Sequence, residues 1–368
     1  MKKSLLQVCL IVVFACSTLF TAAQHISDNT KLKLPADKSS AYRELVAANM
    51  LIYQRNSGGW PKHINNVKLD YTKQLSSADE AAVKDDSFRN DATIDNGATV
   101  KEIRFLAEQF KLTGQKQYLN AAEKGISYLL KAQYPNGGWP QYYPDTSGYR
   151  KHITYNDNAM VNVLSLLQDV SQGLHDMDAV DKSLVPLSKA AVEKGIDCIL
   201  NTQVKVNGQL TVWCAQHDKN TLQPTKARAY ELISLSGSES AGILDFLIRQ
   251  KNPSERMKAS IIAAINWFKV VAVKGYKYDD IPDSTKPKGY DRLLLKAPES
   301  VVWARFYEIS TNEPFVSGRD GVKKKDVNDL EYERRSGYAW YGTWPKRLIE
   351  VKYPAWAATY LSKSVSTK

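Results

Sequence analysis

Helical periodicity, repeated along almost the whole chain, is the feature that most constrains its fold. Apolar residues recur at intervals of three and four in segment after segment, which is the pattern of amphipathic helices. Strand-like alternation is confined to short pieces such as residues 209–214. The segments that we expect to be helical are residues 40–55, 92–112, 117–133, 156–172, 184–203, 238–250, 256–272, 298–309 and 346–361.

A short motif follows two of these helices. Residues 54–61 and 133–140 both end in Gly-Gly-Trp-Pro, and Thr343-Trp344-Pro345 partly repeats the motif. The spacing of about 80 residues equals two helical hairpins and predicts an all-α-dominated fold, an (α/α) toroid or barrel of hairpins with short irregular β segments. Each tryptophan either covers the end of a hairpin or presents its ring to a sugar. Trp139 is the candidate for the second role.

The N-terminus has the pattern of a secretory signal. Lys2 and Lys3 precede an apolar stretch, and small residues up to Ala23 supply a cleavage site. A lipoprotein signal acylated at Cys16 is the alternative. We therefore expect a signal peptide at 1–23, a linker at 24–39 and a single catalytic domain at 40–362. No other stretch is long and apolar enough to span a bilayer, so we expect an exported protein with no transmembrane segment in the mature chain.

The net charge of the chain indicates the kind of partner that it binds. The chain of 368 residues has 50 Lys and Arg against 39 Asp and Glu, a formal net charge of +11 that favours an anionic partner. Its 20 Tyr and 8 Trp are typical of a protein that binds sugars. Export and the lack of a recognisable module argue against nucleic acid. Cys198 and Cys214 remain after signal cleavage, either as a disulfide or as two buried thiols.

Two Asp-Asn pairs stand at predicted helix starts, within residues 91–99 and 153–160. A role as helix N-cap explains Asp91 but does not explain the second aspartate, Asp95. Carboxylate and amide oxygens together suit Ca²⁺ and suit zinc poorly, so Asp95, Asn96 and Asp157 are candidate metal ligands. Either pair alone is also explained as a helix cap.

Lys226 and Arg228 have only one acidic residue near them in sequence, Glu231. Lys226 and Arg228 lie among small and hydroxyl side chains in residues 215–243, and Arg292, Arg305 and Arg319 follow. Guanidinium groups bind carboxylates in a bidentate way, so the pattern favours a substrate with many carboxylates. For each arginine a structural salt bridge is the alternative.

The sequence resembles the tenth family of polysaccharide lyases, which are pectate lyases. The resemblance covers residues from about 40 to 360 and is carried by residues 136–144, 153–160 and 223–240. It implies calcium-dependent β-elimination on polygalacturonate (pectate), with Arg228 as the catalytic base and Asp95 and Asp157 holding Ca²⁺. It also implies that Arg292, Arg305 and Arg319 bind the substrate, and we add the neighbouring Lys226 to that set.

An arginine base needs a physical account. The guanidinium pKa is above about 12, so we expect an alkaline pH optimum, and we expect Lys226 and Ca²⁺ to lower the proton affinity of Arg228.

Two alternative functions stay open. One is an inverting glycoside hydrolase that uses Asp95 and Asp157 as its acid and base. The other is a non-catalytic surface glycan-binding protein. We expect the mature chain to be a monomer.

Overall fold

The computed structural model describes residues 39–361. The predicted signal peptide, Cys16 and the linker up to residue 38 lie outside the described residues, as does residue 362. Within residues 39–361, no helix is long and apolar enough to cross a membrane.

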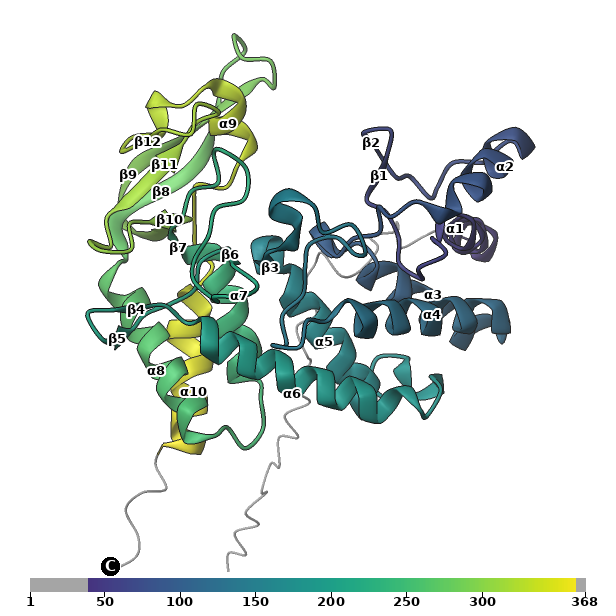
Figure 1. Ribbon diagram of the computed structural model, residues 1–368. Helices are drawn as coiled ribbons and strands as arrows, with labels where there is room; N and C mark the ends of the chain where they lie inside the picture. The colour runs from purple at the N-terminus through teal and green to yellow at the C-terminus, as the bar shows by residue number, and fades with distance from the viewer. Residues whose placement is uncertain (1–38, 362–368) are drawn as a thin grey trace, which may run out of the picture.

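Helices in two rows surround the core of the molecule, and the chain alternates between the rows (Figure 1). The core of buried aliphatic and aromatic side chains lies between them. The first row contains α1 (Ser40–Tyr53), α4 (Lys116–Ala132), α6 (Leu184–Thr202) and α8 (Glu255–Val270). The second row contains α3 (Val100–Thr113), α5 (Ala159–Gln172), α7 (Gly237–Ile248) and the π-helix η8 (Leu348–Lys352), which continues into α10 (Tyr353–Tyr360).

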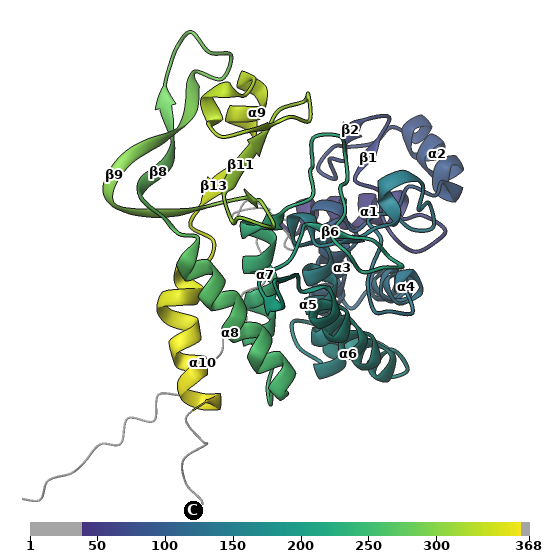
Figure 2. The ribbon, with the colours of Figure 1, turned by 60° about the vertical axis from the view of Figure 1, so that its left-hand side comes forward.

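These rows make an open ring of hairpins. Neighbouring helices contact one another within each row, and α3–α4, α5–α6 and α7–α8 pair between the rows. Figures 1 and 2 show α1 and α10 at opposite ends of the arrangement. The predicted (α/α) toroid is therefore confirmed, and the predicted helices within 40–55, 117–133, 156–172, 184–203, 238–250, 256–272 and 346–361 agree with the observed ones to within a few residues.

A buried tryptophan closes the end of each first-row helix. In every case the indole N–H donates to a backbone carbonyl near the C-terminus of that helix. The four pairs are Trp60 with Met50 (2.7 Å), Trp139 with Leu129 (2.8 Å), Trp213 with Ile199 (2.8 Å) and Trp303 with Phe268 (2.7 Å).

The repeat is therefore fourfold, and the sequence motif marks only its first two copies. Insertions separate helix from tryptophan in the other copies. The hairpin β4–β5 (Lys205–Val206, Gln209–Leu210) precedes Trp213, and Trp303 lies near the end of the second strand of a long hairpin. Trp139 has no exposed surface. The prediction that its ring binds a sugar is wrong, because the whole ring is packed in the core.

Glycines allow the first two motif loops to lie directly on the next helix. Gly137 has φ +89°, and a Cβ there would lie 2.0 Å from the carbonyl oxygen of Lys194. Gly58 repeats this arrangement on Lys124. We expect Gly137→Ala to lower the free energy of unfolding by about 1–3 kcal/mol or more, measured by urea denaturation. Gly114→Ala is the control, since Gly114 also has positive φ but nothing within 4 Å of a Cβ. An equal loss in both variants would contradict the role of the close approach.

A long β-hairpin rises from the ends of the helices (Figure 1). It consists of β8 (Val273–Pro282) and β9 (Tyr290–Ala304), and β13 (Tyr341–Gly342) pairs with β9. The predicted helix at 298–309 is wrong, because its β-branched Val301 and Val302 pair with β8 in this hairpin.

The remaining strands are short. Those near the site are β3 (Ile153–Thr154), β6 (Gln216–His217), β7 (Leu235–Ser236), β10 (Phe306–Tyr307), β11 (Pro314–Ser317) and β12 (Lys323–Lys324). Near the N-terminal end lie β1 (His63–Ile64), β2 (Val67–Lys68) and α2 (Ser77–Asp85), and α9 (Tyr332–Gly337) lies beside the long hairpin.

Candidate active site

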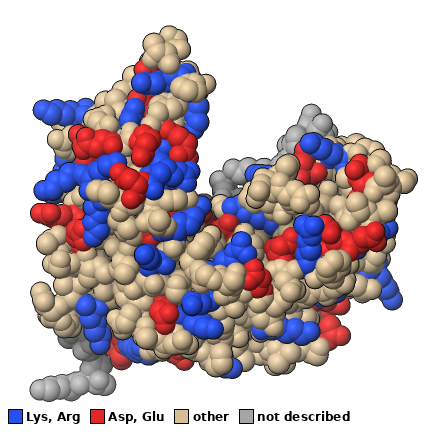
Figure 3. Space-filling view, turned by 45° about the horizontal axis from the view of Figure 1, so that its top comes forward, with Lys and Arg blue, Asp and Glu red and all other residues tan. Residues whose placement is uncertain are grey.

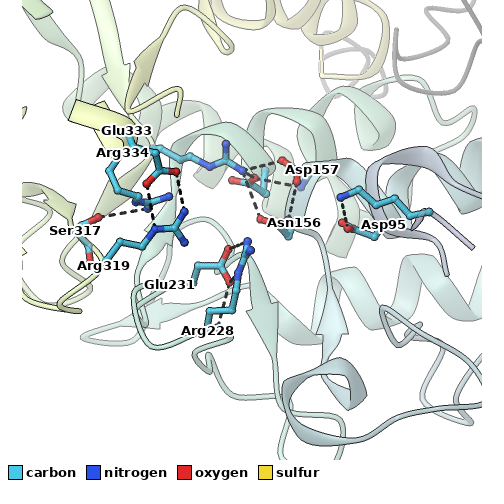
Figure 4. Close-up of polar contacts among 12 residues, drawn as sticks. Asp95, Asn156, Asp157, Arg228, Glu231, Ser317, Arg319, Glu333 and Arg334 are labelled. Atoms are coloured by element: carbon cyan, nitrogen blue, oxygen red, sulfur yellow. Dashed lines mark hydrogen bonds and ion pairs between the residues drawn. The ribbon is translucent and has the colours of Figure 1, made fainter. Parts of the chain in front are cut away.

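The candidate site is built by the segments that follow the four buried tryptophans and lead into the second-row helices. The first carries Asp95, the second Asp157, the third Arg228, and the fourth Arg305 and Arg319. Figure 4 shows the labelled side chains in a row, from Arg319 through Arg228 and Asp157 to Asp95. Figure 3 shows the molecule hollowed between the part that holds the β8–β9 hairpin and the part that holds α2. The fold thus brings together residues that are far apart in the sequence.

Both Asp-Asn pairs form tight 3-10 turns before a second-row helix. Asp95 opens η3 (Asp95–Gly97), is 8% exposed, and accepts a hydrogen bond from Lys62 Nζ at 2.7 Å. The following Asn96 is exposed and has φ +49°. Asp91 is not a helix cap as predicted: its carboxylate accepts two hydrogen bonds from the guanidinium of buried Arg55, at 2.7 and 2.8 Å.

The second turn, η5 (Asn156–Asn158), carries Asp157 at φ +52°. Asn156 Nδ2 donates to one carboxylate oxygen of Asp157 at 2.8 Å, and Arg305 donates to the other at 3.0 Å. The turn therefore holds its carboxylate between an amide and a guanidinium, and Asn156 is the buried asparagine beside it.

Arg305 is the buried centre of an ion-pair cluster. Its Nη2 donates to Asp157 at 3.0 Å and to Glu239 at 2.5 Å, and its guanidinium lies 4.4 Å from the ring centre of Tyr338. Glu239 is 1% exposed, in the first turn of α7, where Ser236 also hydrogen-bonds its carboxylate. Burial acts to lower the pKa of Arg305, but Glu239, Tyr338 and Asp157 together outweigh it, and the pKa is raised. Arg305 therefore stays protonated and fixes Asp157.

Arg228 lies in the loop before α7 and forms an ion pair with Glu231. Its Nε and Nη2 donate to the two oxygens of that carboxylate at 2.9 and 2.5 Å, and its backbone N–H donates at 3.1 Å. The hydrogen bonds that the Arg228 guanidinium donates to Glu231 are the main cause of a raised pKa at Arg228. This is opposite to the expectation that its surroundings lower its proton affinity. The side chain is 48% exposed, and Nη1 makes no hydrogen bond with any other described residue.

Tyr230 gathers three arginines around one ring. The guanidinium carbons of Arg228, Arg319 and Arg334 lie 5.1, 4.6 and 4.8 Å from its ring centre. Arg319 also pairs with Glu333 at 2.7 Å. Cation–π attraction to the shared ring partly offsets the repulsion between the three cations.

Arg334 is a member of this group that the sequence did not reveal. It is 5% exposed, contacts Tyr338 and Trp340 as well, and donates to the carbonyl of Ser317 at 3.3 Å. Its pKa is lowered by burial. No ion pair joins it to a carboxylate among the described residues, and its buried Nε has no hydrogen-bond partner there.

A strand pair links the Asp157 turn to the Arg228 loop. β3, just before the turn, pairs with β6, which ends at buried His217. The Nδ1 of His217 lies 2.9 Å from the carbonyl oxygen of Leu222, and its Nε2 accepts from the N–H of Cys214 at 3.2 Å. Burial lowers the pKa of His217 to about 4, so the ring is neutral near neutral pH and holds the base of the loop.

The other candidate residues lie outside these contacts. Lys226 is exposed on the Arg228 loop. Arg292 lies on the long hairpin, where it pairs with Asp280 at 2.5 Å and contacts the ring of Tyr290. The structure therefore does not bring it to the site residues of Figure 4. Cys198 and Cys214 are both buried free thiols.

The two aspartate turns fit a hard cation as part of its ligand shell. Asp95, Asp157 and Glu239 share two cations, Lys62 and Arg305, which leaves one negative charge in excess. Within residues 39–361, no group of three or more Asp, Glu, His or Cys side chains is arranged so that it could hold a metal ion by itself. Oxygen donors that leave part of the shell open suit Ca²⁺, which takes six to eight oxygen ligands and accepts water or ligand oxygens among them.

Comparison with known proteins agrees with this fold. Residues 54–349 match the family model for pectic acid lyase. A mutant of the family 10 polysaccharide lyase from Cellvibrio cellulosa, in complex with trigalacturonic acid, is 38% identical, with a TM-score of 0.74 over 86% of this chain and 93% of that one. A second structure of the Cellvibrio family 10 lyase is 36% identical, with a TM-score of 0.71 over 89% of this chain and 98% of that one. No curated protein matches the chain.

The toroid, the family match and the similarity to these lyases thus define an enzyme that cleaves polysaccharides by a lyase reaction. The chain belongs to the pectic acid lyase family, and the resemblance seen in the sequence is confirmed.

Proposed function

We propose that this protein cleaves polygalacturonate by calcium-dependent β-elimination, with Arg228 as the base. The observation that carries the proposal is the line of site residues in Figure 4, where a cluster of arginines adjoins the two aspartate turns. A polymer with a carboxylate on every sugar presents regularly spaced anions, and guanidinium groups are well suited to bind them. The complex of the Cellvibrio lyase with trigalacturonic acid supports this substrate class.

The reaction removes the C5 proton of a uronate. The electrons of that C–H bond form a C4–C5 double bond, the bond from C4 to the glycosidic oxygen breaks, and the departing oxygen takes up a proton. Arg228, in its neutral form, accepts the C5 proton. Glu231 fixes the orientation of the guanidine group, which matters because proton transfer requires accurate positioning.

Two groups of residues have the other roles in this proposal, which are substrate binding and calcium binding. Arg319 and Arg334, stacked on Tyr230, bind substrate carboxylates next to Arg228, and Lys226 adds positive charge to the same loop. Asp95 and Asp157 hold Ca²⁺, and Arg305 positions Asp157. When bound, Ca²⁺ neutralises the uronate carboxylate and so makes the adjacent C5 proton more acidic.

The type of products tests this proposal. Mass spectrometry of the oligosaccharides formed from polygalacturonate should show one unsaturated end in each cleavage event, lighter by one water than a hydrolysis product. Products of full hydrolytic mass would show an inverting hydrolase instead. Intact polymer, retained by the protein without cleavage, would favour the glycan-binding alternative.

A base held by Glu231 predicts a defined pH dependence. Only neutral Arg228 accepts the proton, so activity should rise with pH below its pKa, by up to about tenfold per pH unit. Glu231 raises that pKa. Glu231→Gln should therefore lower it and move the rising limb of the pH–rate profile to lower pH. Glu255→Gln, which removes an exposed carboxylate on α8, is the control. An unmoved limb in Glu231→Gln would argue that Arg228 is not the base.

Localisation and assembly remain predictions of the same proposal. Export through the signal at 1–23 would deliver the enzyme to its polymeric substrate outside the cytoplasm, and we propose that the mature chain acts there as a monomer.

A further inference from the structure

An open cleft lies between α8, the β4–β5 hairpin and the turn between β10 and β11 that contains Asn312. Figure 1 shows this hairpin beside α8. The volume of the cleft is about 680 Å³, within the range of ligand pockets. None of the residues labelled in Figure 4 lines it, so it is separate from the candidate active site.

The helical repeat shows why this cleft is open. In three copies, a glutamine that follows a first-row helix donates its side-chain N–H to a backbone carbonyl of the next first-row helix. The pairs are Gln54 with Ala121, Gln133 with Ala191 and Gln203 with Ser260. Three residues beyond these carbonyls, the glycine loops of the first two copies lie on Lys124 and Lys194. The equivalent residue of the third copy, Ala263, lines the cleft, because the β4–β5 insertion takes the place of a glycine loop.

The lining of the cleft is uncharged. Within residues 39–361 no Lys, Arg, Asp, Glu or His lines it, although the chain has a formal net charge of +11. Leu210, Ile262 and Val270 supply apolar surface, and Val270 is 78% exposed. Such a lining offers a carboxylate no ion pair, and a charge that is removed from water without a partner is destabilised. The cleft therefore favours a neutral ligand.

Three side-chain amides supply hydrogen-bonding groups in the cleft. The amide of Asn312 has a fixed orientation, because the indole N–H of Trp267 donates to its Oδ1 at 2.7 Å. Asn312 Nδ2 and the exposed side-chain amides of Gln209 and Asn266 make no hydrogen bond with another described residue. An amide both donates and accepts, so these groups suit neighbouring hydroxyl groups of a ligand.

We propose that this cleft binds a neutral sugar unit of a polysaccharide. The hydroxyls bind the amides of Gln209, Asn266 and Asn312, and the C–H face of the ring packs on Ile262 and Val270. A sugar carries both kinds of surface on one ring, as the lining of the cleft requires. The proposal rests on this lining and goes beyond the reaction proposed for Arg228.

The indole N–H of Trp267 reports on the cleft, because it is bound to Asn312. Two-dimensional NMR of the full mature chain follows this signal, which is assigned by its loss in Trp267→Phe. The probes are galactose, arabinose and rhamnose, with galacturonate as the charged counterpart of galactose. We expect at least one neutral sugar to shift the signal to saturation below about 100 mM, and galacturonate to bind at least about tenfold more weakly.

Two variants test the lining of the cleft. Ala263→Leu fills the cleft without removing a hydrogen-bonding group and should weaken sugar binding by at least about tenfold. Asn266→Ala removes one exposed amide, should weaken binding by about fivefold, and serves if Ala263→Leu does not fold. Arg256→Ala, on α8 but outside the cleft, is the control and should leave binding unchanged.

Three results would overturn the proposal. They are a Trp267 signal that none of the three neutral sugars moves, an equal response to galacturonate, and a signal that moves with protein concentration alone, which would show that a second copy of the chain covers the cleft. Elimination products together with a silent Trp267 would reject only this cleft. A responding Trp267 without elimination products would reject only the proposed function.

Discussion

Replacement of Arg228 by alanine is expected to lower kcat on polygalacturonate by about a hundredfold to ten-thousandfold, with a smaller change in KM. The reason is that a general base acts in the transition state, whereas in the proposed mechanism Arg319 and Arg334 would still bind the substrate carboxylates in the ground state. The protein should unfold at a temperature close to that of the unaltered chain, because Arg228 is 48% exposed. Steady-state kinetics and thermal unfolding measure both quantities.

Arg256→Ala is the matched control for this variant. Arg256 is an exposed arginine on α8 that hydrogen-bonds Asn201, outside the row of site residues, so its removal should leave both kinetic constants within a few-fold. A large rise in KM with kcat retained in Arg228→Ala would instead make Arg228 a substrate-binding residue and would remove it from the chemical step.

The second large effect concerns stability. Arg305→Met should lower the free energy of unfolding by about 3–5 kcal/mol, because it leaves the buried carboxylate of Glu239 without its cation. The double variant Arg305→Met/Glu239→Gln should recover part of the loss, since it removes the uncompensated charge as well. Urea denaturation of the three proteins measures these differences.

An exposed ion pair provides the comparison for Arg305. Arg319 and Glu333 have side chains that are 49% and 65% exposed, so Arg319→Met should cost no more than about 1 kcal/mol. If Arg305→Met were as mild as Arg319→Met, the cluster around Asp157 would not be the fixed scaffold described above.

Most of the fold was predictable from the sequence because its helices are amphipathic. The β8–β9 hairpin was not, because Val301 and Val302 fall at spacings that also fit a helix, and only pairing with β8 decides between the two. The fourfold repeat was only half visible. Trp213 and Trp303 occupy the same structural position as Trp60 and Trp139, but insertions separate them from the helices whose ends they close.

The site was predictable to the extent that its residues share local patterns. The aspartate turns at Asp95 and Asp157 stood out because both precede helices, and Arg228 stood out in a long specific segment. Tyr230, Glu239 and Arg334 were missed. The Ser236-to-Glu239 spacing is the pattern of a capping box, so it signals a helix start but not an ion pair with Arg305 from another repeat. Contacts of this kind depend on folding and leave no local signal.

Ultraviolet absorbance during the action of the purified enzyme on polygalacturonate tests the central claim most directly. The C4–C5 double bond conjugated with the carboxylate absorbs, whereas a hydrolysis product does not. With CaCl₂ the absorbance should rise, EGTA should stop the rise, and excess CaCl₂ should restore it. New reducing ends without absorbance, or a rise that EGTA leaves unchanged, would contradict calcium-dependent elimination.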